Sequence, residues 1–267
     1  MPTTNLLDQL VAAVQESTKY RTVSAALVRT IGAQELGKRH NLKEAIKATK
    51  NKLHQIAGAY QIGKADYAGW LAPLQQAAGD RAALRPICRA MMAHHASTRE
   101  RLVILDEFYR TLFAGLPPIA SILDLACGLN PLTIPWMPLP SGVTYYACDI
   151  YQDQVDFFQQ CLTWLGVAGE AQSCDLLQTC PTQTVDVALL LKTIPCLEQA
   201  DKLIGRRLLA EINAPVLFVS FPAQSLGGHN KGMTVNYEQH FQDLVSGKPW
   251  QIERFAFATE LVFRIIK

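Results

Sequence analysis

Long apolar runs are absent from the sequence. Stretches such as Val187 to Leu191 and Val216 to Val219 have the length of a strand and are far too short to cross a bilayer. No apolar segment near the N-terminus precedes a small-residue cleavage site. We therefore expect a cytoplasmic protein without a membrane partner. Its 267 residues, 49% of them hydrophobic, are enough to bury a full core.

The cysteines lack the spacing of a metal site. There are seven of them, an odd number, and no two are arranged as C-x-x-C. This pattern supports neither a disulfide framework nor a zinc site, so we expect no metal. We interpret the cysteines as small buried side chains in a reducing compartment.

The glycine pattern of dinucleotide enzymes, G-x-G-x-x-G, is also missing. In the stretch Ser121 to Pro131 (SILDLACGLNP) an apolar run is followed by the single Gly128, which argues against NAD and FAD. Asp124 and a small-residue turn suit S-adenosylmethionine better, because that cofactor has no pyrophosphate to hold. We predict that it lies over the turn of Ala126, Cys127 and Gly128. The alternative is a sheet strand that ends in an ordinary turn.

Charge is distributed unevenly, although the net charge is only +2. Residues 1–115 hold 16 Lys and Arg against 9 Asp and Glu, whereas residues 116–267 hold 9 against 14. The segment from Lys19 to His54, called the basic segment below, holds 9 against 2. Such a cluster predicts a surface that faces a polyanion, and a solvated helix face is the alternative. The residues predicted to contact the polyanion, which the family resemblance described below implies is RNA, are Lys19, Arg21, Lys43, Lys47, Lys50 and Lys52.

The first part of the chain has helical periodicity. Between Asn5 and Phe113 apolar residues recur at helix spacing, which predicts five or six helices and no strand. Asn41 begins an Asn-x-x-Glu pattern of the kind that forms a capping box. The stretch His94 to Arg110 (HHASTRERLVILDEFYR) predicts one last helix, capped by Ser97 or Thr98.

After residue 118 the pattern changes to strands that alternate with helices, which predicts a doubly wound parallel sheet. Two adjacent runs at the C-terminus leave no room for a helix between them and predict an antiparallel hairpin at the sheet edge. The arrangement resembles a class I, Rossmann-like methyltransferase domain at residues 116–267, preceded by a helical, basic domain at residues 1–115, which the family resemblance described below implies is an RNA-docking domain. The predicted strands are 119–125, 144–149, 170–174, 185–191, 216–221, 251–258 and 260–266, with helices at 152–165 and 198–212.

Acidic residues end two successive predicted strands. Asp149 ends the second strand and Asp175 follows the third, and ligands of such sheets lie at these carboxyl ends. We predict that Asp149 accepts hydrogen bonds from ribose hydroxyls and that Asp175 contacts an adenine amino group. The alternative role of each is a helix cap.

The residues after the fourth predicted strand, LLKTIPCLE, occupy the place where many methyltransferases hold the target base. Enzymes that methylate amino groups usually have an acid, Asn or Ser there, followed by Pro-Pro and an aromatic residue. This chain has Lys192 instead. The mismatch argues against an exocyclic amine and for an acceptor atom that carries no proton.

Several separate motifs, in order over nearly the whole chain, resemble one family. They are HASTRERL (95–102), SILDLACGLNPL (121–132), PWMPL (135–139), LLLKTIPCLEQ (189–199), SFPAQSLGGHNKGM (220–233) and TELVF (259–263). This family comprises the aminoglycoside-resistance methyltransferases of the Arm, Rmt and FmrO type, which modify N7 of a decoding-site guanine in 16S ribosomal RNA. The resemblance implies S-adenosylmethionine as donor, S-adenosylhomocysteine as product, and the assembled 30S subunit as substrate. We expect a monomer.

The resemblance also implies roles for individual residues. Arg101 would reach the methionyl carboxylate of the cofactor, and Lys192 and Glu198 would face the target nucleotide. The loop Ser220 to Met233 would contact RNA through Ser220, His229 and Lys231, although members of the family vary at His229 and often carry another basic residue. The full predicted cofactor set is Tyr60, His95, Ser97, Thr98, Arg99, Glu100, Arg101, Asp124, Ala126, Cys127, Gly128, Asp149, Ile150, Asp175, Leu176, Leu191 and Gln199.

The implied chemistry agrees with the missing base. N7 of neutral guanine has an in-plane lone pair and no proton, so the enzyme mainly has to align the reactants and exclude water. We expect the guanine to be flipped out of its helix, and Glu198 to offset the positive charge of the product. The alternative is a methyltransferase that acts on a different RNA, a protein or a small molecule. A small-molecule enzyme would not require the basic segment.

Overall fold

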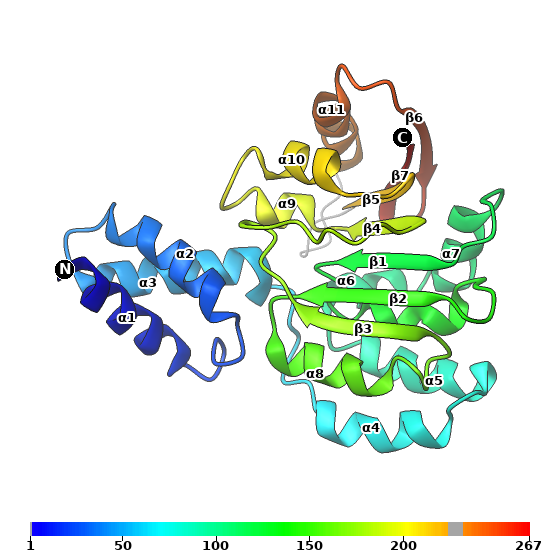
Figure 1. Ribbon diagram of the computed structural model, residues 1–267, viewed down its shortest axis with the longest axis horizontal. Helices are drawn as coiled ribbons and strands as arrows, with labels where there is room; N and C mark the ends of the chain where they lie inside the picture. The colour runs from blue at the N-terminus through cyan, green and yellow to red at the C-terminus, as the bar shows by residue number, and fades with distance from the viewer. Residues whose placement is uncertain (1, 224–231) are drawn as a thin grey trace.

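A seven-stranded sheet forms the centre of the structure, a computed structural model that describes residues 2–223 and 232–267 (Figure 1). The strand order is β3-β2-β1-β4-β5-β7-β6. The first five strands in the chain run parallel, and β7 pairs antiparallel with both β5 and β6. The predicted parallel sheet and C-terminal hairpin are therefore confirmed. The strands are β1 (Ser121–Leu125), β2 (Thr144–Asp149), β3 (Ala168–Ser173), β4 (Val187–Leu191), β5 (Val216–Pro222), β6 (Gln251–Ala256) and β7 (Glu260–Ile266).

Helices precede the sheet and connect its strands, and the described residues before β1 contain no strand, as predicted. No helix in the described ranges is long and apolar enough to cross a membrane. The first group is α1 (Pro2–Gln15), α2 (Ala25–Leu36), α3 (Leu42–Leu53), the π-helix η1 (His54–Gly58), α4 (Tyr67–Gln76), α5 (Arg81–Met92), α6 (Ala96–Arg101) and α7 (Leu105–Phe113). The second is the 3-10 helix η2 (Asn130–Trp136), α8 (Gln152–Cys161), α9 (Ile194–Leu197), α10 (Ile204–Glu211) and α11 (Met233–Val245).

Several helix predictions were wrong in number or bounds. Seven α-helices precede β1 instead of five or six, because the stretch predicted as one last helix is divided into α6 and α7. Arg101 is the last residue of α6 and its side chain binds the Glu260 carboxylate of β7, while α7 buries Phe108 in the core on one face of the sheet. Neither Ser97 nor Thr98 is the cap of α6: His95 holds that position. The stretch 198–212 likewise contains only α10, with α9 as a separate turn before it, and α8 ends at Cys161.

The N-cap predicted at Asn41 is confirmed, but the Glu44 carboxylate bonds the Asn41 side chain instead of the Asn41 backbone N–H that a full capping box would use. The Asn41 side chain accepts a hydrogen bond from the backbone N–H of Glu44 at 2.9 Å and donates one to the Glu44 carboxylate at 3.0 Å. This arrangement satisfies a backbone donor that would otherwise be free at the start of α3.

Both faces of the sheet are covered, and neighbouring residues on a strand enter different cores. Ile122 and Phe218 pack with α4, α5, α7 and α8 on one face. Leu123 and Val219 pack with α9, α10 and α11 on the other. Helices α4 and α5 thus lie against the sheet, whereas α1–α3 form a lobe that projects from its side (Figure 1). A boundary between functional domains at residue 115 stays a prediction.

Hydrogen bonds join the projecting lobe to the sheet at several places, one of them from the Gln178 side chain to the carbonyl of Ala26 at 3.3 Å. The backbone N–H of Ser24 donates to the carbonyl of Ile150 at 2.8 Å, and that of Gln152 donates to Thr22 at 2.8 Å. On the other side, Lys52 Nζ donates to the carbonyl of Gln199 at 2.8 Å. The basic segment is therefore attached directly beside the carboxyl ends of β2 and β4.

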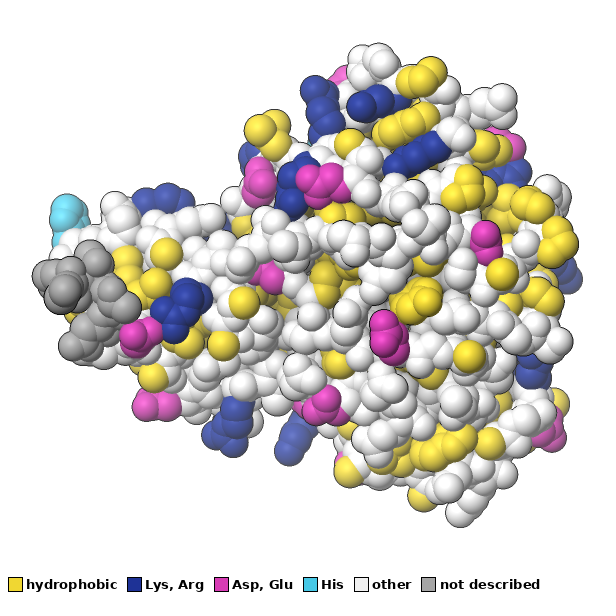
Figure 2. All heavy atoms as spheres, in the orientation of Figure 1, with side chains coloured by type: hydrophobic (Ala, Val, Ile, Leu, Met, Phe, Trp, Pro, Cys, Tyr) yellow, Lys and Arg dark blue, Asp and Glu magenta, His cyan; other side chains and the backbone are white. Residues whose placement is uncertain are grey.

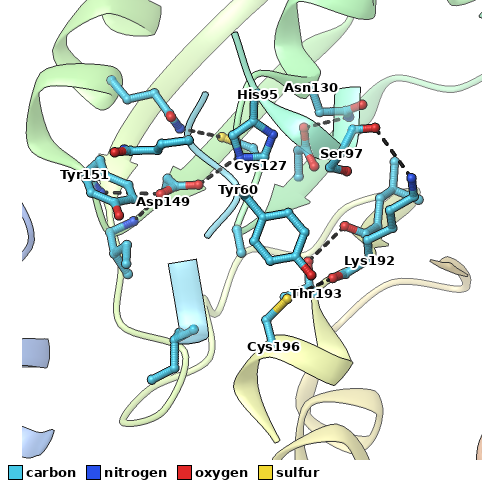
Figure 3. A pocket seen from close by; sticks show the side chains of 18 of the residues that line it. Tyr60, His95, Ser97, Cys127, Asn130, Asp149, Tyr151, Lys192, Thr193 and Cys196 are labelled. Carbon is cyan, nitrogen blue, oxygen red and sulfur yellow. Dashed lines mark hydrogen bonds between the residues drawn. The ribbon is translucent and has the colours of Figure 1, made fainter. Parts of the chain in front are cut away.

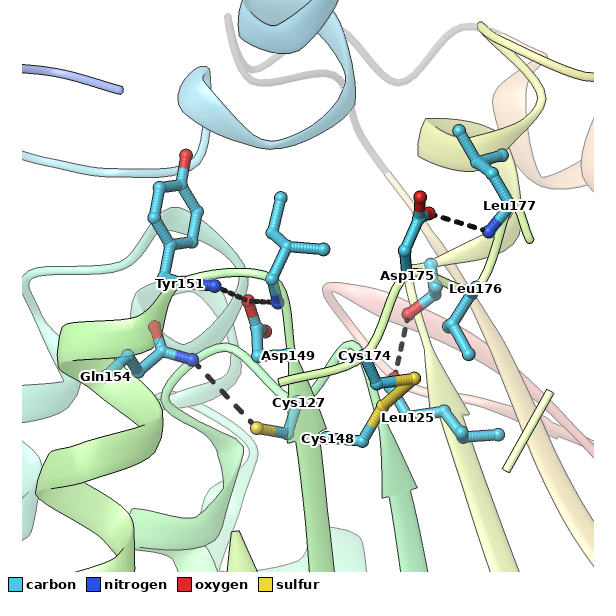
Figure 4. Close-up of a disulfide and its surroundings, with 12 residues drawn as sticks. Leu125, Cys127, Cys148, Asp149, Tyr151, Gln154, Cys174, Asp175, Leu176 and Leu177 are labelled. Atoms are coloured by element: carbon cyan, nitrogen blue, oxygen red, sulfur yellow. Dashed lines mark hydrogen bonds between the residues drawn. A yellow bond between two sulfur atoms is a disulfide. The ribbon is translucent and has the colours of Figure 1, made fainter. Parts of the chain in front are cut away.

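One expectation about the cysteines was wrong, because Cys148 and Cys174 form a disulfide (Figure 4). Cys148 lies in β2 and Cys174 directly follows β3, the neighbouring strand, so that their Cα atoms are 5.6 Å apart. Sequence spacing missed this pair because strand pairing brings together two residues 26 positions apart. The other five cysteines are free, and no cluster of possible metal ligands occurs in residues 2–223 and 232–267.

Candidate active site

A cavity with an empty volume of about 760 Å³, including space open to solvent, lies at the carboxyl ends of β1, β2 and β4. Figure 3 shows that Tyr60, Asp149 and Lys192 approach it from different elements. Many of the residues predicted to bind the cofactor line this cavity: Tyr60, His95, Ser97, Arg101, Asp124, Ala126, Cys127, Gly128, Asp149, Ile150 and Leu191. Lys192, predicted to face the target, also lines it.

The floor of the cavity is the tight turn after β1. Ala126 and Gly128 have φ angles of 49° and 51°, in the left-handed region. A Cβ atom at Gly128 would lie 2.8 Å from His95 Cε1, so this position requires glycine for both its backbone conformation and its space. The turn thus packs closely against His95, and its residues Ala126, Cys127 and Gly128 line the cavity.

Gly128→Ala is expected to lower the free energy of unfolding by about 1–2 kcal/mol for the left-handed conformation alone, with a further decrease from the clash with His95. Gly142→Ala is the matched control, since Gly142 has φ 81° and no atom within 4 Å of an added Cβ. Chemical denaturation measures both. Equal decreases in the two variants would mean that the turn can move away from His95.

Asp149 joins this turn to the end of β2. Its buried carboxylate accepts hydrogen bonds from the backbone N–H groups of Gly128 at 2.8 Å, Ile150 at 2.7 Å and Tyr151 at 3.3 Å. Burial raises the pKa of Asp149, and these N–H donors oppose the increase because they stabilise the charged form. The residue holds the turn in place and presents an acceptor to the cavity.

Asp124 lies on β1 beneath the cavity. Its Oδ2 accepts hydrogen bonds from Tyr145 Oη at 2.6 Å and Asn130 Nδ2 at 2.9 Å. Burial raises the pKa of this carboxyl group to about 7, although both hydrogen bonds and Arg101 act to lower it. Asp124 therefore supports the cavity wall through Asn130 and Tyr145.

A buried network of charges forms the wall next to Asp124. Arg101 donates through Nε and Nη2 to both carboxylate oxygens of Glu260, at 2.9 and 2.7 Å, and through Nη1 to Asn130 at 2.7 Å. Lys192 Nζ lies 2.7 Å from Glu100 and 3.6 Å from Glu260. Burial would raise the pKa of Glu260, but Arg101 and Lys192 outweigh it and lower that pKa. The two cations are thus held in place and compensated.

His95 contributes an unused polar atom. Its Nδ1 is buried and has no hydrogen-bond partner among the described residues. Burial, with Arg101 and Lys192 nearby, lowers the pKa of His95 to about 4, so the ring is neutral at physiological pH. The ring stacks on Tyr60 with centroids 6.0 Å apart. An unpaired nitrogen on the wall of a cavity with a glycine floor is what a site for a polar ligand requires.

Some predicted cofactor residues lie outside the lining of the cavity. Thr98 donates to the carbonyl of Met92 at 2.8 Å, and Gln199 is exposed. Asp175 accepts from the backbone of Leu177 at 3.0 Å and from Gln178 at 2.9 Å, next to the disulfide (Figure 4). The remaining ones are Arg99, which is exposed, Glu100, which pairs with Lys192, and Leu176, which is buried in the core.

Sequence reasoning missed several residues of the site. Asn130 and Glu260 lie inside motifs that carried the family resemblance, so their position was a usable signal. Three further lining residues, Thr193, Cys196 and Leu197, lie inside the motif LLLKTIPCLEQ and had the same signal. The others lie outside the quoted motifs: Ile56 in the π-helix η1, Gln61, Tyr151 and Gln154.

Residues predicted to face the target or RNA are placed as follows. Glu198 is not in the cavity lining and pairs with His240 of α11. Ser220 is fully buried and donates to Glu260 at 2.5 Å, so its side chain is unavailable to RNA in this structure. His229 and Lys231 lie outside the described residues.

The basic segment covers the projecting lobe, and Figure 2 shows Lys and Arg side chains on its visible face. Arg21, Lys43 and Lys47 are exposed, and Lys50 is half-buried. Lys19 is exposed and its Nζ lies 2.9 Å from His54 Nδ1. Lys52 differs from the others, because it binds the Gln199 carbonyl and connects the lobe to the sheet.

Known proteins resemble the chain over almost all its length. A family model described as "Ribosomal RNA methyltransferase (FmrO)" matches residues 16–264. The chain is 41% identical to a 16S rRNA (guanine(1405)-N(7))-methyltransferase of Micromonospora rosea, over 98% of this chain and 97% of the relative. It is 34% identical to the protein of the same name from Serratia marcescens, over 98% and 99%.

Solved structures agree. The 16S rRNA methyltransferase RmtF, in complex with S-adenosyl-L-homocysteine, has a TM-score of 0.83 at 32% identity and 98% coverage of both chains. The 16S rRNA methylase RmtB has a TM-score of 0.77 at 28% identity, with the same coverage. The seven-stranded sheet is thus the class I S-adenosylmethionine-dependent methyltransferase fold, and the chain belongs to the FmrO family of ribosomal RNA methyltransferases.

Proposed function

We propose that the protein transfers the methyl group of S-adenosylmethionine to N7 of a guanine in the decoding site of 16S rRNA in the 30S subunit, and thereby confers aminoglycoside resistance. The observation that carries this proposal is the full-length similarity to relatives that bear this activity in their names. The protein acts as a monomer in the cytoplasm, where its substrate is found.

The cavity residues fit the cofactor. S-adenosylmethionine supplies an electrophilic methyl group. Asp149 accepts hydrogen bonds from the ribose, and the turn around Gly128 lets the backbone come close. His95 offers its unpaired Nδ1. Arg101 supplies positive charge for the cofactor carboxylate, although its guanidinium nitrogens also bind Glu260 and Asn130.

The acceptor N7 needs no general base, because it has a lone pair and no proton. Lys192 fits a reaction without a general base, since its ammonium group is paired with Glu100 at 2.7 Å and only 3% of the residue is exposed. The residues around the cavity have to align the guanine and exclude water. A guanine inside a helix cannot reach the cavity, so we infer that it is flipped out at a cost of a few kcal/mol.

Docking on ribosomal RNA is assigned to the lobe formed by α1–α3. It carries the basic segment and is attached beside the carboxyl ends of β2 and β4, next to the cavity. Three cations of the segment are already paired with acids: Arg29 with Asp8, and Lys38 and Arg39 with Glu35. The exposed lysines of α3 are therefore the strongest candidates for phosphate contacts.

Replacing Lys43, Lys47 and Lys50 together with alanine is expected to weaken binding to 30S subunits and to flatten its salt dependence. The logarithmic slope should shrink by about 0.7–0.9 for each lysine that neutralises a phosphate. Binding across a salt series measures this effect. Cofactor affinity serves as the control and should not change. Wild-type binding at every salt concentration would contradict the assignment of α3 to the RNA interface.

The experiment that tests the proposed function compares three acceptors for the labelled methyl group: intact 30S subunits, naked 16S rRNA and ribosomal protein. We expect label in the rRNA of intact subunits. Label in protein alone, or in neither RNA sample, would contradict the proposal.

A further inference from the structure

The side chains of Glu198 and His240 lie within ion-pair distance of each other beside the cavity. The function proposed above assigns no role to this pair. His240 Nε2 lies 3.0 Å from Oε1 and 2.9 Å from Oε2 of Glu198. Glu198 follows the short helix α9, whose residues Cys196 and Leu197 line the cavity, and His240 lies on α11. The helices α9, α10 and α11 are grouped on one face of the sheet (Figure 1).

Packing around the pair restricts the Glu198 side chain. A Cβ atom at Gly205 of α10 would lie 3.1 Å from Glu198 Oε1, so this side of the carboxylate is closed. His240 packs edge-on against Phe221, which also stacks on Tyr237. The Glu198 side chain is 11% exposed and that of His240 is 35% exposed. The carboxylate is therefore fixed by its neighbours and still reached by solvent.

A fixed carboxylate at this place matches the chemistry of guanine. A guanine that offers N7 to the methyl group carries its N–H donors, at N1 and N2, on another edge. An ionised carboxylate only accepts hydrogen bonds, and it has lone pairs left after one histidine contact. Burial raises the pKa of Glu198, while His240 opposes this increase and favours the ionised form.

We propose that His240 is a positioning residue for the target base: through its Nε2 it holds the Glu198 carboxylate in the orientation that accepts the N–H donors of the flipped guanine. The inference rests on the proposed function. His240 acts only through Glu198, because it is not among the residues that line the cavity.

The test uses two variants that remove the same ring. In His240→Gln the side-chain amide nitrogen can take the place of Nε2, whereas in His240→Asn it is too short to do so. Both are made in the full-length protein, alone and together with Glu198→Ala. Gln239→Ala, at an exposed neighbouring position of α11, is the control. Steady-state methyl transfer gives kcat and KM for 30S subunits, and calorimetry gives the cofactor Kd.

We expect His240→Asn to lower kcat/KM for subunits about tenfold or more, the effect of one hydrogen bond to a charged group. The cofactor Kd should stay within about twofold of wild type, and His240→Gln should recover most of the activity. In the Glu198→Ala background, His240→Asn should have no further effect, because the two residues act as one unit.

Three results would overturn the inference. His240→Asn could be as active as wild type, both variants could lose activity equally through weaker packing on Phe221, or the decrease could persist in the Glu198→Ala background. A wild-type enzyme that leaves guanine N7 unmethylated would instead contradict the proposed function, and the inference with it.

Discussion

Glu260→Ala is expected to lower the free energy of unfolding by about 3–5 kcal/mol, because it leaves buried cations without their counter-charge. The Glu260 side chain is completely buried and binds Arg101 through two hydrogen bonds. It also lies 3.6 Å from Lys192 and accepts from Ser220. Denaturant titration followed by circular dichroism measures the decrease.

Glu253→Ala is the matched control on the same hairpin. Glu253 pairs with Arg264, but its side chain is 46% exposed, so we expect a decrease of at most about 1 kcal/mol. Similar decreases in Glu260→Ala and Glu253→Ala would show that water reaches the Arg101 network and that it is not a buried framework for the site.

Glu260 is also expected to make the stability of the protein depend on pH. The pKa of Glu260 in the folded protein is lowered by Arg101 and Lys192, despite its burial, and therefore lies below that of the unfolded chain. The contribution of Glu260 to the free energy of unfolding is fully present above its pKa in the unfolded chain, about 4.3. This contribution is lost as the pH falls through the pKa of Glu260 in the folded protein. The difference in melting temperature between wild type and Glu260→Gln should accordingly narrow on acidification below pH of about 4.

Asp149→Ala is expected to weaken cofactor binding by about 2–4 kcal/mol, since charge-assisted hydrogen bonds are removed from a site that the ligand desolvates. The structure adds a second reason, because Asp149 also fixes the Gly128 backbone that forms the cavity floor. Isothermal titration calorimetry with S-adenosylmethionine measures the change.

Asp156→Ala is the control for this measurement. Asp156 lies on α8, in the helix that follows β2, and is exposed with its carboxylate bonded to Gln152. It should bind the cofactor like wild type. A folded Asp149→Ala variant that kept wild-type affinity would place the ribose elsewhere in the cavity.

The sequence predicted the sheet well because its central strands β1, β4 and β5 and the strand β7 are short, mainly apolar runs with clear ends. Strands β2 and β7 have the predicted bounds, and the turn at Gly128 lies where a single glycine indicated it. Local patterns failed where tertiary contacts decide. The helical stretch is divided at Arg101, whose guanidinium binds Glu260, a residue 159 positions away in the sequence.

The candidate site, like the fold, was predictable where a residue has a local sequence signature. Asp149 and Gly128 are recognisable because strand ends and small-residue turns have local signatures. The contact between His95 and Gly128, and the pair of Glu198 and His240, have no such signature, since they depend on how separate helices pack at the sheet. The disulfide between Cys148 and Cys174 was missed because it depends on the pairing of β2 with β3.

The most direct test of the proposed function is to map the methylated atom. Purified 30S subunits are incubated with the protein and S-adenosylmethionine, and the extracted 16S rRNA is digested and analysed by mass spectrometry together with a cleavage reaction specific for 7-methylguanosine. We expect one new 7-methylguanosine, located in the decoding site. Methylation of another base, or of a guanine atom other than N7, would contradict the proposed function.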